Sequence, residues 1–156
     1  MEKLISRKNY KFYTMMREIL LDLELADKDY WWFINDVEAY PEKAEFEALL
    51  DSDYILLKTS DLMEMLNEDD FQWIWGIFSA IPTKYSREEI LQYDFPYVQF
   101  FDEGQYNPYC DEPRIQHPLA EFEIYAVDSS EMFIVTDNEE LIQRFKKCYG
   151  GHHSTL

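Results

Sequence analysis

Residues 121–149 read EFEIYAVDSSEMFIVTDNEELIQRFKKCY and carry the clearest structural signals in the chain. Aromatic and β-branched residues fill 121–127 and 131–135, as they do in strands. The Asp-Ser-Ser sequence at 128–130 is typical of a tight turn. The sequence therefore predicts a β-hairpin over these residues.

A helix is predicted over 139–149, directly after the hairpin. Asp137 and Glu140 have the spacing of a capping box, which satisfies free backbone N–H groups in the first helical turn. Gly150 suits the left-handed conformation that ends many helices.

The most apolar stretch, FQWIWGIFSAI at 71–81, predicts a central strand that Pro82 ends. Strand alternation would place Trp73 and Trp75 on one face. Gly76 indicates a bulge or a close approach of neighbouring atoms.

Toward the N-terminus, helix and strand patterns alternate. Apolar spacing predicts a helix over 10–25 with Asn9 as its N-cap. YWWFI at 30–34 and VEAY at 37–40 predict two short strands joined by a hairpin turn at Asn35-Asp36.

The following residues predict a helix, a strand and another helix. Pro41 suits the first position of a helix through EKAEFEALL, although that segment also fits an outward-charged strand. DYILLK at 53–58 predicts a buried strand, and Ser60 is suited to cap a helix over 61–68.

Ser86 and Glu89 form a second predicted capping box, ahead of a short helix. PYVQFF at 96–101 predicts another strand, and residues 102–118 lack periodicity and predict a long loop.

Interspersed helices and hairpins predict the fold class. We expect an α+β fold with a mainly antiparallel sheet of about five to six strands and three to five helices packed on it. Residues 1–150 should form this single domain, with 151–156 as a flexible tail.

Charge limits the choice of partners. The 156 residues include 14 Lys and Arg against 32 Asp and Glu, which gives a net charge of −18. This field repels phosphates and anionic lipids, so nucleic-acid and membrane partners are not expected. It attracts basic proteins, although acidity can also serve solubility alone.

The expected location is the cytoplasm. The N-terminal residues show no basic-then-apolar leader, and the apolar runs are too short to span a membrane. Cys110 and Cys148 are expected to be reduced and packed.

Neither a catalytic site nor a metal site is predicted. Cys110, Asp111, Glu112 and His117 lack the paired spacing of zinc ligands. The chain has no Gly-x-Ser-x-Gly elbow and no glycine-rich phosphate loop. We expect no enzyme activity and no cofactor; an enzyme would need a cleft in which His117 meets a carboxylate or Cys110.

Adjacent carboxylates recur throughout the chain. With 32 acidic residues such pairs arise by chance, and we expect them on solvated faces. Glu121 and Glu123 alternate with apolar residues, which predicts a half-exposed strand.

Acidic residues are concentrated in one segment. Residues 18–70 hold 17 acidic residues and 3 Lys, whereas residues 1–17 are net basic. A concentrated acidic face with aromatic anchors suits a basic protein surface. The candidate partner-binding residues are Asp51, Asp53, Glu64, Glu68, Asp69, Asp70, Tyr106 and Tyr109.

The tryptophans leave a second hypothesis open. Adjacent Trp31 and Trp32 must point to opposite faces of a strand. Core packing accounts for such residues, but an aromatic pocket near Trp31, Trp32 or Trp75 would make the protein a small-ligand or regulatory module. A structural or adaptor role is the remaining alternative.

The small size, the acidic segment, the YWWFI and FQWIWGIF strands and the closing hairpin and helix resemble the small acidic immunity proteins of bacterial toxin systems. The layout is also similar to uncharacterised bacterial single-domain α+β proteins with a Tyr-Trp-Trp segment near the start. The resemblance implies an inhibitor that occludes a basic protein, such as a cationic toxin or nuclease. It concerns the overall pattern, so no residue carries a family role, and the sequence does not indicate the oligomeric state.

Overall fold

A computed structural model describes residues 1–6, 14–93, 111–150 and 152–153, and the statements below refer to these residues. In chain order the elements are β1 (Glu2–Ser6), α1 (Met16–Asp22), β2 (Tyr30–Ala39), α2 (Ala44–Leu50), β3 (Tyr54–Lys58), α3 (Thr59–Glu68), β4 (Trp73–Pro82), α4 (Arg87–Leu91), β5 (Phe122–Val127), β6 (Glu131–Thr136), α5 (Glu139–Tyr149) and β7 (His152–His153).

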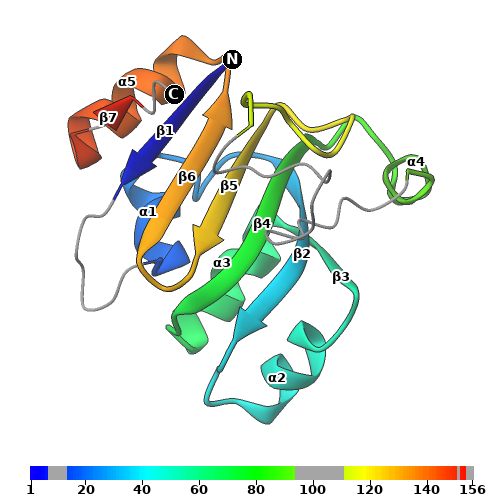
Figure 1. Ribbon diagram of the computed structural model, residues 1–156. Helices are drawn as coiled ribbons and strands as arrows, with labels where there is room; N and C mark the ends of the chain where they lie inside the picture. The colour runs from blue at the N-terminus through cyan, green and yellow to red at the C-terminus, as the bar shows by residue number, and fades with distance from the viewer. Residues whose placement is uncertain (7–13, 94–110, 151, 154–156) are drawn as a thin grey trace.

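One antiparallel sheet contains all of these strands, in the order β3-β2-β4-β5-β6-β1-β7 (Figure 1). The strand β7 is two residues long and pairs with β1. The predicted α+β fold with a mainly antiparallel sheet is confirmed, and so is the hairpin of β5 and β6. None of the described helices is long and apolar enough to cross a membrane.

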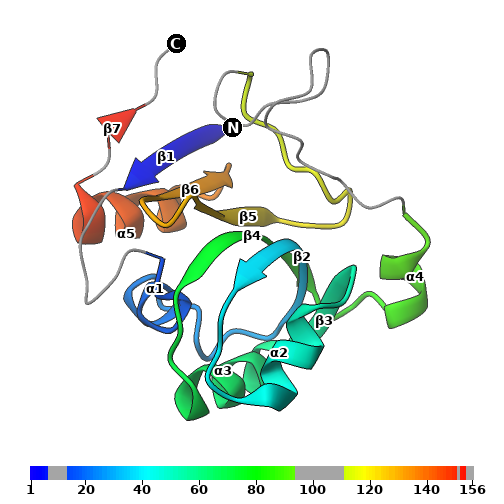
Figure 2. The same ribbon diagram turned by 60° about the horizontal axis from the view of Figure 1, so that its bottom comes forward.

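The main core lies between the sheet and its helices. Figure 2 shows α1, α3 and α5 on the same side of the sheet. Trp32, Phe78 and Phe122 extend from the strands into this layer, where they meet helical side chains such as Leu66 and Phe145. Burial of these large side chains is the main force that holds the layers together.

The opposite face of the sheet is also covered. Phe33 and Ile81 pack there against Ile90 of α4, and a separate apolar cluster contains Tyr125 and Phe133. All six residues of β5 are consequently buried. Both faces of the middle strands therefore exclude water.

The predicted hairpin turn at Asn35-Asp36 is wrong, because β2 continues through it as one strand of ten residues. The register with β4 shifts between Asn35 and Glu38, which marks a β-bulge. Asp36 has a φ of 50°, a left-handed conformation that Asp tolerates in bulges as well as in turns.

The expectation that Trp73 and Trp75 share a face is also wrong. A second register shift lies where Glu38 pairs with Trp75 and Ala39 pairs with Trp73. The extra residue on β4 places Trp73 in the main core and Trp75 against the cluster on the opposite face.

The predicted close approach of neighbouring atoms to Gly76 is confirmed. A Cβ atom at this position would lie 3.1 Å from Cε2 of Phe78. The absence of a side chain therefore leaves room for the Phe78 ring.

Two of the predicted helix boundaries are confirmed. Ser86 and Glu89 form the capping box of α4. Gly150 follows α5 with a φ of 63°, so a left-handed residue ends that helix as expected.

Two predicted caps are wrong by about one residue. Asn138, and not Asp137, caps α5 by accepting the backbone N–H groups of Glu140 and Leu141. Helix α3 begins at Thr59 after Lys58 and has no side-chain cap, so Ser60 lies inside its first turn.

The segment after Pro41 is a helix and not a strand, and α2 begins only at Ala44. Helix α1 begins at Met16 within the predicted range, whereas Asn9 and the predicted strand at 96–101 lie outside the described residues. Strand β1 was not predicted. Its five residues pair with β6.

Candidate functional site

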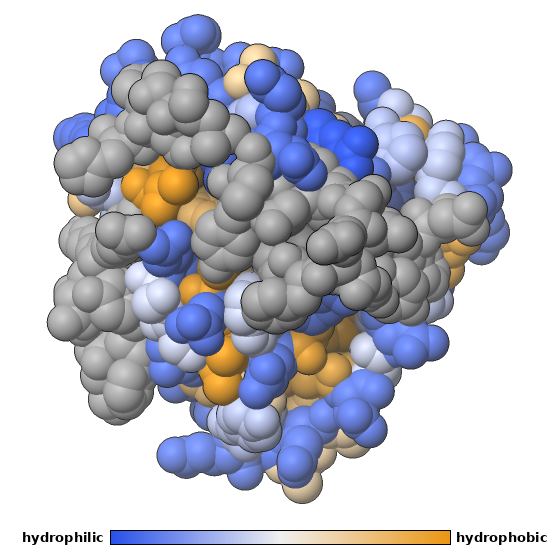
Figure 3. Space-filling model, in the orientation of Figure 1, coloured by the Kyte–Doolittle hydropathy of each residue, from blue (hydrophilic) through white to orange (hydrophobic). Residues whose placement is uncertain are grey.

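The predicted acidic residues lie between α2 and β3, on α3, and directly after α3. We call residues 42–70 the acidic lobe. Its exposed acidic side chains belong to Glu42, Glu45, Glu47, Asp51, Asp53, Asp61, Glu64, Glu68 and Asp70. Figure 3 shows hydrophilic side chains around α2, with hydrophobic ones above them toward the sheet.

Contacts between the residues before α2 and the residues at the end of α3 hold the two ends of the lobe together. Lys43, before α2, forms an ion pair with Glu68 at the end of α3. The carboxylate of Asp69 accepts the backbone N–H groups of Glu42 and Lys43 at 2.8 and 2.9 Å. Asp69 is only 8% exposed, so this carboxylate supports the lobe and offers little contact surface.

The other predicted residues are distributed over the same lobe. Asp51 and Asp53 lie between α2 and β3, and exposed Glu64 lies on α3. Tyr106 and Tyr109 lie outside the described residues.

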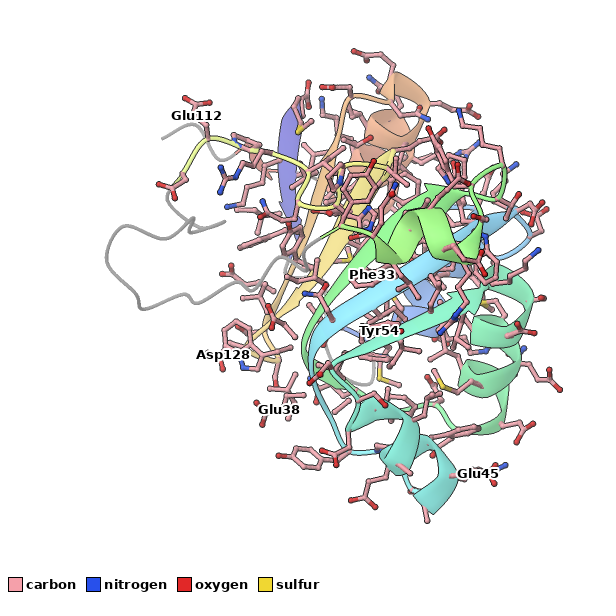
Figure 4. The ribbon with its side chains drawn as sticks, turned by 90° about the vertical axis from the view of Figure 1, so that its right-hand side faces the viewer. Phe33, Glu38, Glu45, Tyr54, Glu112 and Asp128 are labelled. Atoms are coloured by element: carbon pink, nitrogen blue, oxygen red, sulfur yellow. The ribbon has the colours of Figure 1, made fainter. Side chains whose placement is uncertain are left out.

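A hollow of about 470 Å³ lies between the end of β2 and α2. Three carboxylate residues, Glu38, Glu47 and Asp51, contribute to its lining, and neither Lys nor Arg does. The remaining lining residues are Val37, Ala39, Tyr40, Ala44, Ala48 and Leu50. In Figure 4, Glu38 and Glu45 extend on either side of α2.

Tyr40 is the most exposed of the large hydrophobic residues described, with 70% of its surface accessible. Its hydroxyl donates a hydrogen bond of 3.1 Å to Oε1 of Glu38, and this bond raises the Tyr40 pKa. The hollow thus combines carboxylates, apolar walls and an accessible ring. Sequence reasoning included Asp51 but missed Glu38, Tyr40 and Glu47, because the β-bulge that shapes the end of β2 has no strong sequence signal.

The tryptophans proposed to line an aromatic pocket are engaged in packing. Trp32 is fully buried, lies edge-on to the Tyr30 and Phe122 rings, and donates a hydrogen bond of 2.9 Å to Thr59. The indole N–H of Trp31 donates to the Tyr85 carbonyl oxygen at 3.1 Å. Trp32 is thus part of the core, whereas Trp31 is half-buried and packs against the cluster that contains Phe33 and Ile81.

The second polar feature is a buried carboxylate at the centre of the sheet. Glu123 has no accessible surface and accepts four hydrogen bonds. Its donors are the hydroxyls of Ser79 and Tyr125, at 2.8 and 2.6 Å, and the backbone N–H groups of Gln116 and His117, at 2.9 and 2.8 Å. We call these five residues the Glu123 cluster.

Burial raises the pKa of Glu123, and its four hydrogen bonds act in the opposite direction. The expectation of a half-exposed strand is wrong for Glu123, because the backbone of Gln116 and His117, in the covering segment 111–120, lies over its carboxylate. Glu121 is exposed as expected and accepts a hydrogen bond of 2.9 Å from Tyr30.

Among the described residues, the hydrogen-bond partners of the His117 ring are backbone groups and not carboxylates. Its Nε2 lies 3.2 Å from the Ile90 carbonyl oxygen, and its Nδ1 accepts the backbone N–H of Leu119 at 3.2 Å. This arrangement fits a neutral imidazole with its hydrogen on Nε2. Burial lowers the His117 pKa, while the bond to Ile90 partly opposes this change.

The described residues contain no group of three or more His, Cys, Asp or Glu side chains placed to hold a metal ion. Cys148 is a free thiol that points to the Asp22 carbonyl oxygen at 3.4 Å, and Cys110 lies outside the described residues. The acidic lobe is therefore the best candidate surface for an external ligand.

Comparison with known proteins identifies no relative: no family model matches the chain, and neither the curated proteins nor the solved structures contain a match.

Proposed function

We propose that the protein is an acidic protein-binding module that grips a basic partner through its acidic lobe. The observation that carries this proposal is the hollow beside α2, whose described lining residues include Glu38, Glu47 and Asp51 but neither Lys nor Arg. Unbalanced negative charge in a concave surface is suited to a cationic group of another molecule.

The lining of the hollow suits a Lys or Arg side chain. The apolar residues Val37, Ala48 and Leu50 offer a surface for its hydrocarbon stem, while the carboxylates receive its charged end. The exposed Tyr40 ring adds an aromatic anchor that can contact the same cation. A basic side chain would therefore gain both packing and charge contacts.

The surrounding acidic residues would act mainly on association. Asp53, Glu64 and Asp70 are exposed on the lobe and extend its negative field beyond the hollow. Such a field steers a basic protein into position, and short-range contacts then slow its dissociation. An immunity-type inhibitor would use this grip to occlude the working surface of a cationic toxin or nuclease.

Affinity capture from a lysate of the native host tests the first part of the proposal. Immobilised protein should retain a basic protein at low salt and lose much of it at about 0.5 M salt, where the Debye length is roughly 4 Å. Retention that is unchanged by salt, or of proteins without a basic surface, would contradict an electrostatic grip.

Charge reversal then tests the lobe itself with the captured partner. The double variant Glu47→Lys and Asp51→Lys should lower the association rate about tenfold and weaken its dependence on salt. The double variant Glu88→Lys and Glu112→Lys changes the net charge equally at exposed positions outside the lobe. If both double variants lowered the association rate equally, the rate would depend only on the total charge and not on the acidic lobe.

A further inference from the structure

The end of β2 forms a short edge within the sheet. Among the described strands, β3 pairs with β2 only over residues 31–35, whereas β4 continues beside β2 as far as Ala39. Residues 32–35 are accordingly buried, whereas residues 36–39 are partly accessible, with Glu38 exposed. From residue 36 onward, β2 thus has a described strand partner on one side only. An edge of this kind can pair with another strand.

The hollow beside α2 follows this edge. Four consecutive residues, 37–40, contribute to its lining, whereas a hollow on one face of a strand would be lined by every second residue. The opposite wall is one face of α2, where Ala44, Glu47, Ala48 and Asp51 recur at helical spacing and are all exposed. The hollow is therefore a groove between a strand edge and a helix.

The groove has room for a polypeptide backbone. Its volume is about 470 Å³, and two of the four side chains on the α2 wall are the small ones of Ala44 and Ala48. Figure 4 shows α2 below the end of β2, where Glu38 is labelled. A lone Lys or Arg side chain would occupy part of this space and leave the strand edge without a partner. An extended segment would fill the groove and also supply hydrogen bonds to the edge.

We propose that the basic partner of the acidic lobe enters this groove as an extended segment and adds to β2, over residues 37–39, as an antiparallel strand. This mode of binding rests on the proposed function, because it takes the basic partner as given and specifies its bound conformation. The strand β3 runs antiparallel to β2 on the same side. The added strand would therefore continue the line of β3 beyond Tyr54, and main-chain hydrogen bonds would hold it.

The side chains along the groove favour a basic segment. Val37 and Ala39 pack against the main core, so Glu38 and Tyr40, which alternate with them, share the outer side of β2. The hydrogen bond between Tyr40 and Glu38 agrees with this placement. Every second side chain of an added strand would lie beside these two residues. A Lys or Arg there would meet the Glu38 carboxylate and the Tyr40 ring, whereas an acidic or neutral residue would gain neither contact.

Fluorescence anisotropy with a labelled peptide of about eight alternating Lys and Thr residues tests this mode of binding, since Thr favours strands. The peptide should bind at low salt with a dissociation constant below about 1 mM. Two methylated forms keep its charge but lose backbone N–H donors, one at every Lys and the other at every Thr. Only alternate N–H groups of an added strand face its neighbour. One form should therefore bind at least about tenfold more weakly, and the other within about threefold of the parent peptide.

Equal binding by the parent peptide and both methylated forms would overturn the added strand, because side chains alone would then be gripped. That result would leave the proposed function intact. A parent peptide that does not bind would also overturn the added strand. The proposed function fails separately, if capture from the lysate retains no basic protein in a salt-dependent way.

A change in the groove wall tests the location. Ala48→Leu adds bulk on α2 without changing the charge, and should weaken binding of the parent peptide about tenfold. Ser60→Leu is the matched control, at an exposed position of α3 that does not line the groove, and should stay within about threefold of wild type. Hydrogen exchange should show that the bound peptide protects β2 amides over residues 37–39. Equal binding by both variants, or no protection of these amides, would overturn the proposal.

Discussion

The backbone N–H of His117 donates a hydrogen bond of 2.8 Å to the buried carboxylate of Glu123, and this bond fastens the segment 111–120 to the sheet. Because Gln116 donates to the same carboxylate, two consecutive backbone groups of this otherwise irregular segment find their acceptor on β5. Buried backbone N–H groups need such partners, since an unsatisfied one costs free energy. A single side chain thus replaces the strand pairing that this segment lacks.

Glu123→Gln should lower the free energy of unfolding by about 1–3 kcal/mol. The amide keeps one oxygen acceptor but puts an N–H₂ group against donors, so at least one backbone N–H of the cluster loses its acceptor. Urea unfolding followed by circular dichroism measures the change.

Glu112→Gln is the matched control, at an exposed position of the segment 111–120 itself. It should change the free energy of unfolding by less than about 0.5 kcal/mol, as surface substitutions do. If the two substitutions had equal effects, the Glu123 cluster would not be a main support of the covering segment.

His117 should make the protein less stable in mild acid. Burial lowers its pKa below the ordinary value of 6.5, so the unfolded chain takes up a proton at a higher pH than the folded protein does. The stability that the neutral ring contributes is present above about pH 6.5 and is lost as the pH falls through the lowered pKa.

The pH dependence of His117→Gln isolates this contribution. Glu123 has the opposite sign, because burial raises its pKa, and its contribution falls as the pH rises. When the unfolding free energy of His117→Gln is subtracted from that of wild type, the contributions of the carboxylates that both proteins share cancel. This difference should fall between about pH 7 and pH 5, and a constant difference would contradict a buried neutral imidazole.

Local patterns predicted many of the elements because short-range physics determines them. The hairpin of β5 and β6, the Ser86 cap and the Gly150 helix end all follow from a few neighbouring residues. Asn138 shows the limit of such reasoning: Asp137 and Asn138 are both residue types that cap helices well, so the sequence does not distinguish between them, and the structure has Asn138 as the cap.

Long-range pairing explains the larger errors. The strand β2 continues through Asn35 and Asp36 because it pairs with β4, which is itself ten residues long. A β-bulge lies where the sequence predicted a turn. The same irregularity turns Trp73 and Trp75 to opposite faces. Neither outcome can be read from one strand alone, because register is a property of the pair.

The candidate site was predicted only in part. The concentration of acidic residues indicated the lobe, and Asp51 does line its hollow. Asp69 was expected on the surface but binds the backbone before α2, and Glu123 was expected on a solvated face. Burial of a carboxylate depends on what the rest of the chain places over it, which composition does not reveal.

Asp69→Ala should lower the free energy of unfolding by about 1–2 kcal/mol and loosen α2. The substitution removes the acceptor of the Glu42 and Lys43 backbone N–H groups, which then have no partner at the start of the helix. Hydrogen exchange of the α2 amides measures the loosening, with exposed Glu64→Ala as the control. Faster exchange in the control than in Asp69→Ala would contradict this role of Asp69.

Ionisation of Tyr30 should lower the free energy of unfolding at high pH. Partial burial, followed by the hydrogen bond to Glu121 and the charge of that carboxylate, raises the pKa of Tyr30 to about 12. The unfolded phenol ionises near its ordinary value of 10.0, so the stabilising contribution of the neutral phenol is complete below that pH and is lost as the pH rises toward 12. Between about pH 9 and pH 11, wild type should therefore lose more unfolding free energy than Tyr30→Phe, which cannot ionise there. Glu121→Gln should fall between them, because it removes the carboxylate but leaves the burial; parallel curves for wild type and Tyr30→Phe would show that the phenol is not held neutral.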